Sequence, residues 1–484
     1  MSKLEGLTSR LDDWINPIVV KELRQVVRGR LVPIALILYL CVLLLVMGIG
    51  ISSITPTENM SAGRGIFFGF VVVFTLVAFI LIPASLSLML GLERNQENID
   101  LIYITTLPPY RIVAGKLLAG LIQVMLFLFA ALPFMTTTYL LRGIDIPTVF
   151  VIMFTALLVA LLNIQWGLFI AVLPINRLFK GALGLGTLFL YFISFTGFLQ
   201  WAEQTSRRGV GPHTASDWWT VMFLSIVTIL AVALLLFLVS VAIVKPPSAN
   251  RSKPIRHYLS FTWVASFLGV IFFTTDRDAM EVWAALTMCV CLFTMLAAIS
   301  EREELGHRVR RSIPSGFFKR LPAFFHFSGN ASGVAWTILV LTITQVLLLF
   351  DDTWDKDFSI VSLGLSFFLV AYALSGHFLQ RNYFHKRLPR GFTWVISIGL
   401  LFIFSVGAWL LSFFIYPKSW DSMGDSGWLH LLNPFSLSED KWWPLILISS
   451  GGWCLIMFVL EKNWFFARWR AFRAPEQAPE GHVQ

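Results

Sequence analysis

The sequence predicts an all-α polytopic membrane protein, with about twelve transmembrane helices in two six-helix halves and an N-terminal amphipathic interfacial helix. Of its 484 residues, 57% are hydrophobic and 13% are charged, whereas a soluble domain is about 45–50% apolar and about 25% charged. Its mean hydropathy is +0.75. The formal net charge of +9 does not indicate a nucleic-acid partner, because an excess of Lys and Arg is typical of the cytoplasmic loops of membrane proteins.

The first element is a cytoplasmic segment, residues 1–30, that precedes any apolar run. Asn16 and Pro17 have the residue types of a helix N-cap and first helical position. Val19 and Leu23 follow at helical spacing, with basic residues on the other side. This pattern predicts a basic amphipathic helix that lies in the membrane interface; the alternative is an extension of the first span.

Apolar runs near the length of about 20 residues that a span requires occur twelve times. The expected spans are 31–51, 66–90, 117–138, 149–173, 181–199, 218–244, 258–273, 282–299, 334–350, 358–379, 392–415 and 443–460. Residues 461–484 form a tail that is expected to be disordered after residue 473.

Charge predicts the orientation of these spans. The N-terminal segment, the even-numbered loops and the tail together hold 29 of the 37 Lys and Arg but only 13 of the 28 acids. The positive-inside rule therefore places both termini in the cytoplasm of a multi-pass protein of the inner or plasma membrane.

The polar, Pro-rich segment 245–257 is the best boundary between a first half, 31–244, and a second half, 258–460. A weak correspondence links the halves, since Glu93-Arg94 follows the second span and Glu301-Arg302 follows the eighth. In the second half Pro314 then takes the place of Pro108. This is either a decayed duplication or a coincidence between basic loops.

The segment between the second and third spans organises the chain. It opens with charge, becomes amphipathic and is broken by prolines, which lack a backbone donor and end a helix. We expect a surface helix over 93–107; the alternative is an ordinary solvated loop. The candidate residues here are Glu93, Arg94, Glu97, Asp100, Thr106, Pro108, Arg111 and Lys116.

Signatures of enzymes are mostly absent: the sequence holds no phosphate-binding loop, no zinc-protease motif and no serine-hydrolase motif. We therefore expect no catalytic residues, no metal and no bound cofactor. The central parts of the spans carry neutral polar groups only, of which Asn163 and Gln165 are the most prominent. These two either line a path or form interhelical hydrogen bonds.

Glu93, Arg94, Asp100-Leu101-Ile102, Thr106, Pro108, Arg111 and Lys116 resemble the coupling-helix motif in the permease subunits of type-2 ABC (ABC-2) exporters. The segment 16–24 is similar to the amphipathic helix that precedes the first span in that family. The resemblance covers about residues 11–244. It implies that 93–107 docks on a separate ATPase subunit, which binds ATP and Mg²⁺, and that this chain forms the pathway.

We therefore expect the membrane permease of an ATP-driven exporter, not an enzyme. Twelve spans are then either two fused permease halves or a six-span permease with an additional half, and a homodimer or a second permease remains open. The alternatives are a secondary active transporter with twelve spans and a polytopic membrane transferase. The sequence does not indicate the substrate.

Overall fold

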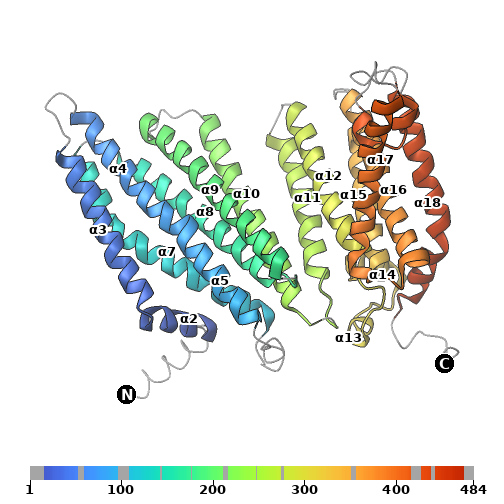
Figure 1. Cartoon of the computed structure of the whole chain (residues 1–484), viewed down its shortest axis with the longest axis horizontal. Coiled ribbons are helices and arrows are strands. Elements are labelled where there is room, and N and C mark those ends of the chain that lie inside the picture. The colour runs from blue at the N-terminus through green and yellow to red at the C-terminus, as the bar shows by residue number, and fades with distance from the viewer. Residues whose placement is uncertain are drawn as a thin grey trace. The chain divides into compact units, whose positions relative to one another are not determined.

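The computed structural model describes residues 16–52, 59–95, 108–141, 144–175, 177–210, 216–246, 248–273, 277–349, 356–415, 427–437 and 442–473. All regular secondary structure in these ranges is helical, and twelve of the helices are long and apolar enough to cross a membrane (Figure 1). This confirms the predicted all-α polytopic membrane fold. The chain divides into two compact units, Met1–Pro246 and Pro247–Gln484, which we describe separately as unit 1 and unit 2.

Unit 1 consists of a short surface helix followed by six spans, the second of which is interrupted by a wider π-helical turn. Its elements are α2 (Pro17–Arg28), α3 (Leu31–Ser52), α4 (Asn59–Leu76), η1 (Val77–Leu81), α5 (Ile82–Asn95), α7 (Pro109–Leu140), α8 (Ile146–Val172), α9 (Arg177–Arg208) and α10 (Ser216–Val244).

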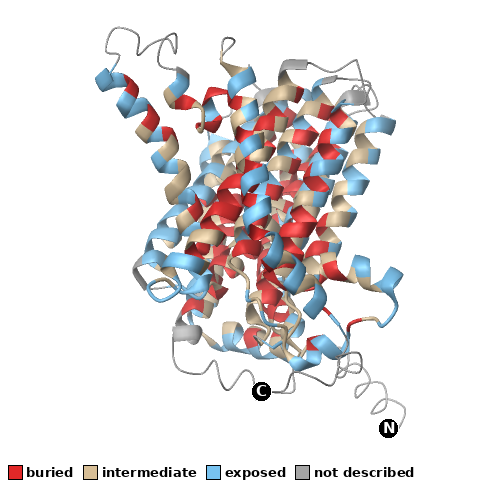
Figure 2. Ribbon diagram, turned by 90° about the vertical axis from the view of Figure 1, so that its right-hand side faces the viewer, coloured by how far each residue is buried: buried red, intermediate tan, exposed pale blue. Residues whose placement is uncertain are grey.

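The fourth span, α8, is the centre of unit 1 and packs against α5, α7, α9 and α10. A continuous apolar core surrounds it, with Phe67, Phe70 and Phe74 of α4 fully buried. Glycine permits the closest approach of the helices, because a Cβ on Gly120 of α7 would lie 2.5 Å from a methyl carbon of Leu86. Buried residues lie along the inward-facing sides of the helices, with exposed residues on their outer sides (Figure 2).

Unit 2 repeats this plan with different surface elements. Its elements are α11 (Lys253–Phe273), α12 (Arg277–Ile299), α13 (His307–Arg311), α14 (Phe317–His326), α15 (Asn330–Leu349), α16 (Lys356–Leu379), η2 (Gln380–Phe384), η3 (Arg390–Phe392), α17 (Thr393–Ile415), η4 (Gly427–His430), η5 (Pro434–Ser436) and α18 (Trp443–Ala471).

Again the fourth span of the unit, α16, is central, and it packs against α12, α15, α17 and α18. These are the second, third, fifth and sixth spans of unit 2, which are the same partners that α8 has in unit 1. A decayed duplication would produce this shared packing order. The described apolar residues of unit 2 fall into separate clusters.

The helices extend beyond the predicted spans where charged residues continue them. α7 begins at Pro109, α11 begins at Lys253 and α18 runs to Ala471. The last five residues of the predicted linker 245–257 are therefore helical. A hydropathy window ends at the first charged residues, but an α-helix continues past the hydrocarbon into the interface, where charge is tolerated.

Candidate functional site

The N-terminal amphipathic helix is anchored to the beginning of the third span. Asn16 caps α2, its side-chain oxygen accepting a hydrogen bond from the backbone N–H of Ile18 at 3.1 Å, and Pro17 occupies the first helical position. This confirms the predicted N-terminal boundary. The Asn16 side chain also donates a hydrogen bond to the backbone carbonyl of Arg111 at 2.5 Å. One residue thus both starts α2 and ties it to α7.

A buried ion pair strengthens this anchor. Glu22 of α2 and Lys116 of α7 are 4% and 7% exposed, and the Lys116 Nζ lies 2.8 Å from a carboxylate oxygen of Glu22. The helices approach closely at Gly115, where a Cβ would lie 2.8 Å from the side chain of Ile18. Because each buried charge depends on its partner for compensation, α2 and the first turns of α7 are held as one element.

The predicted coupling segment, 93–107, connects α5 to α7 along the chain, and most of it lies outside the described residues. Glu93 and Arg94 belong to the last turn of α5, which ends at Asn95, so these positions continue the second span. Glu97, Asp100 and Thr106 lie outside the described residues. Pro108, in an extended conformation, and Pro109 start α7, and the Arg111 N–H bonds back to the Pro108 carbonyl at 2.9 Å.

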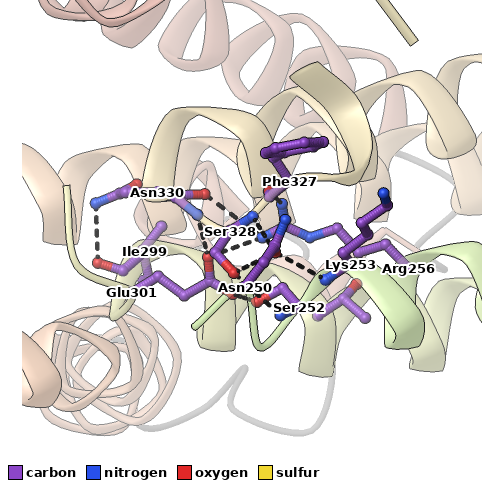
Figure 3. A network of polar contacts seen from close by, with 12 residues as sticks. Asn250, Ser252, Lys253, Arg256, Ile299, Glu301, Phe327, Ser328 and Asn330 are labelled. Carbon is purple, nitrogen blue, oxygen red and sulfur yellow. Dashed lines mark hydrogen bonds and ion pairs between the residues drawn. The ribbon is translucent and has the colours of Figure 1, made fainter. Parts of the chain in front are cut away.

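The corresponding acid of unit 2, Glu301, holds a network of polar contacts (Figure 3). It accepts hydrogen bonds from Ser252, from Arg256 at 2.9 Å and from the backbone N–H of Gly329 at 2.7 Å. Arg256 also donates to the carbonyl of Phe327. The carboxylate therefore joins the beginning of α11 to the turn between α14 and α15.

The linker between the units contributes to the same network. The side-chain oxygen of Asn250 accepts hydrogen bonds from the backbone N–H and the hydroxyl of Ser328, at 3.0 and 2.7 Å. Asn330, at the start of α15, donates to the Ile299 carbonyl at 3.2 Å. The predicted residue Arg302 is exposed, and Pro314 lies between α13 and α14 and is half-buried.

Glu303, two residues after Glu301, belongs to a second cluster of charged side chains. Its carboxylate contacts Arg468 of α18, lies 3.3 Å from Arg390 and lies 3.7 Å from the imidazole of His377. The pKa of Glu303 is lowered to about 2, mainly by the His377 imidazole and further by the two guanidinium groups, although burial acts in the opposite direction. Glu303 is therefore ionised throughout the physiological pH range.

A second carboxylate, Glu461 of α18, completes this cluster from within a membrane-spanning helix. It is 2% exposed, and it lies 3.0 Å from Arg381 and 3.4 Å from the other ring nitrogen of His377. The sequence analysis considered charge only in the central parts of the spans. It did not predict the charged residues that meet at these helix ends. The signal was present, because residues 461, 464 and 468 share one face of a helix directly after an apolar run.

Asn163 and Gln165 form interhelical hydrogen bonds. The Asn163 amide donates to the Ser194 hydroxyl of α9 at 2.9 Å, and Gln165 donates to the Ser240 hydroxyl of α10 at 3.3 Å. Both side chains are buried. Of the two predicted roles, the structure thus gives evidence for the bonding role, in which polar groups hold α8 to its neighbours.

The described residues contain no group of three or more His, Cys, Asp and Glu side chains arranged to hold a metal ion. Comparison of the chain with protein-family models, with curated proteins and with solved structures finds no match. Together the fold and these contacts define the chain as a multi-pass helical membrane protein with polar anchors at the ends of its spans.

Proposed function

We propose that this chain is the membrane permease of an ATP-driven exporter of the ABC-2 type, and that it forms the pathway while a separate subunit hydrolyses ATP. The observation that carries the proposal is the Glu22–Lys116 anchor, which joins α2 to the beginning of α7, the helix that directly follows the coupling motif in the chain. A permease that receives force through this motif needs such a rigid connection.

The order of these elements along the chain determines how a movement of the coupling segment would reach the membrane spans. The segment 93–107 leads directly through Pro108 and Pro109 into α7. A displacement of this segment by the partner would move α7 and α2 together, because the buried ion pair holds them as one element. α7 packs on α8, the centre of unit 1, so the displacement would reach the whole bundle and change access to the pathway.

Two units with the same packing order suit a chain that supplies both halves of a pathway. In this proposal the protein forms the transport pathway and is not an enzyme. The partner subunit binds ATP and Mg²⁺. No second permease is needed. Both termini and the coupling segment face the cytoplasm, in keeping with the charge distribution. The membrane is the cell's inner or plasma membrane.

The test is charge reversal in the coupling segment. Asp100→Lys and Arg111→Glu should each abolish the ATPase activity that co-purifies with the tagged protein, while the amount of protein in the membrane stays unchanged. The matched control is Glu203→Lys, which reverses an exposed acid paired with Arg207 in the last turns of α9 and should leave the activity unaltered. Full activity in both coupling variants would refute the proposal.

A secondary transporter is the second candidate, and one observation favours it. His377 lies between the buried carboxylates of Glu303 and Glu461, and ionisable groups buried in membrane proteins mark proton pathways. The discriminating measurement is transport in cells treated with an uncoupler while ATP is held constant. Continued transport supports the ATP-driven permease, and loss of transport supports the secondary transporter.

A further inference from the structure

A cavity of about 490 Å³ lies inside unit 2, among the spans α12, α15, α16 and α17. Its volume falls in the range of roughly 300–1,000 Å³ that is usual for ligand pockets. It is bordered by Phe368 and Tyr372, which belong to an apolar cluster of α16. Phe435, within η5, contributes to the lining from the segment between α17 and α18.

The lining is almost entirely apolar. Of its polar side chains, Ser366 accepts a hydrogen bond from the Gln345 amide and donates one to the Ser362 carbonyl, and the Tyr372 hydroxyl donates to the Leu432 carbonyl at 2.7 Å. The Ser397 hydroxyl also lines the cavity and has no hydrogen-bond partner among the described residues. One free hydroxyl cannot replace the hydration of a sugar, peptide or ion, which leaves a hydrocarbon as the fitting occupant.

The shape of the cavity matches a single acyl chain. Along α12 the lining runs from Ala285 to Leu296, which is about 16 Å at the helical rise of 1.5 Å per residue. This is close to half of the roughly 30 Å hydrocarbon core of a bilayer. Leu296 is three residues from the end of α12, so the cavity occupies the leaflet on the side of the loop that follows this helix.

The cavity opens on the surface of unit 2 between two spans. Cys289 and Leu292 of α12 and Ile398 of α17 line it and are exposed. At the end of α12 the two helices meet again, where the backbone N–H of Trp394 donates to the Ser300 hydroxyl at 3.3 Å. A chain would therefore enter sideways from the hydrocarbon region.

The loop between α16 and α17 is basic, and its Lys386 and Arg387 are exposed. Arg302, after α12, is also exposed but is flanked by Glu301 and Glu303. Basic residues next to the ends of spans attract the headgroups of anionic lipids. The headgroup of a lipid whose chain fills the cavity would lie at this level of the membrane.

We propose that unit 2 binds one acyl chain of an anionic glycerophospholipid in the cavity between α12, α16 and α17. This binding is independent of the ATPase partner. It requires only the residues of unit 2 and the surrounding bilayer.

The test uses the full chain reconstituted in vesicles that contain phosphatidylglycerol with a photoactivatable diazirine in one acyl chain. Crosslinked peptides are then quantified by mass spectrometry. Labelling of α12 and α17 should exceed that of the equally apolar, lipid-accessible residues Ile37 and Leu38 of α3 by roughly fivefold, which is about 1 kcal/mol of preference. Phosphatidylcholine that carries the same photoactivatable chain should label α12 and α17 less than phosphatidylglycerol does.

Two variants narrow the cavity mouth from opposite walls, Leu292→Trp on α12 and Ile398→Trp on α17. Both positions are about 40% exposed and accept a larger side chain at the surface. Each variant should remove the preferential labelling. The matched control is Leu286→Trp, on the same helix at 62% exposure and outside the lining, which should label as the unaltered protein does.

Uniform labelling of all exposed spans, or labelling that persists in both cavity variants, would overturn the proposal. Equal labelling by phosphatidylglycerol and phosphatidylcholine would overturn its assignment to an anionic lipid. None of these readouts depends on transport or on ATP hydrolysis, so failure here is distinguishable from failure of the permease proposal.

Discussion

At the scale of single residues, the ends of the spans are held by charges that compensate each other. Glu22 and Lys116 in unit 1 form a buried pair, and in unit 2 the carboxylate of Glu303 is paired with the half-buried Arg468 and the buried His377. Oppositely charged groups in a poorly hydrated site stabilise a structure as a set, because removing one removes the compensation of the other. Such pairs therefore fix which elements lie together.

Neutralising one member of the Glu22–Lys116 pair should be costly. We expect Glu22→Gln to destabilise unit 1 by up to about 3–5 kcal/mol, the usual loss when one partner of a buried ion pair is removed. The double variant Glu22→Leu with Lys116→Met should recover most of this stability. The measurement is a double-mutant cycle from unfolding of the detergent-solubilised protein, and independent, additive effects would show that the pair is not coupled.

The contribution of Glu303 should be insensitive to pH near neutrality. Its pKa is about 2 in the folded protein against an ordinary value of 4.5, so the stabilisation is complete above about pH 4.5 and is lost as the pH falls towards 2. The difference in Tm between the unaltered protein and Glu303→Gln should be constant between about pH 5 and pH 8 and shrink below this range. If this difference in Tm already shrinks at a pH above about 6, the titrating group is an imidazole and not the Glu303 carboxyl.

The sequence shows these residues only in part. Lys116 was predicted as a site residue, but Glu22 was not. The pairing spans 94 positions of the chain, and no local pattern specifies which distant charges meet. The same holds for His377 and Glu461, which are 84 residues apart in sequence.

At the scale of elements, glycines set how closely the spans of unit 2 pack. A Cβ on Gly376 of α16 would lie 3.0 Å from the backbone nitrogen of Ser397 and still nearer to its hydroxyl, whereas Gly407 of α17 has no atom within 4 Å of such a Cβ. Substituting alanine at Gly376 changes both helix packing and helix propensity, whereas the same substitution at Gly407 changes helix propensity alone.

Gly376→Ala should destabilise the protein by about 1–3 kcal/mol, the usual cost of overpacking. Gly407→Ala is the control, and it should be neutral or stabilising by up to about 1 kcal/mol, because alanine favours a helix interior. The comparison is of Tm in detergent. Equal shifts for the two variants would contradict the close contact between α16 and α17.

Hydropathy predicted the spans well because it depends on local composition, but it did not predict the π-helical turn η1 or the extension of α18. The π-helical turn at 77–81 lies just before Pro83, which has no N–H to donate to the carbonyl of Phe79 four residues earlier. The turn faces α8, and the Phe79 carbonyl approaches the Asn163 amide at 3.5 Å. The proline is visible in the sequence, but this partner of the carbonyl lies on another helix, which a sequence window does not reach.

At the scale of the whole molecule, twelve spans require that both termini lie on the same side of the membrane. We expect a reporter that is active only in the cytoplasm to function when it is fused after Gln484, and also when it is inserted in the segment after Pro246. The same reporter placed between α9 and α10 should be inactive. Activity at this third position would contradict the orientation given by the positive-inside rule.

If the chain works with a separate ATPase, as we propose, the two should be isolated together. The tagged full chain can be extracted from its native membrane in mild detergent, after brief crosslinking, and the proteins that remain in stoichiometric amounts identified. We expect an ATPase subunit that is retained by the unaltered chain and by Glu203→Lys but lost from Asp100→Lys. A preparation in which the crosslinked, intact chain carries no ATPase would contradict it.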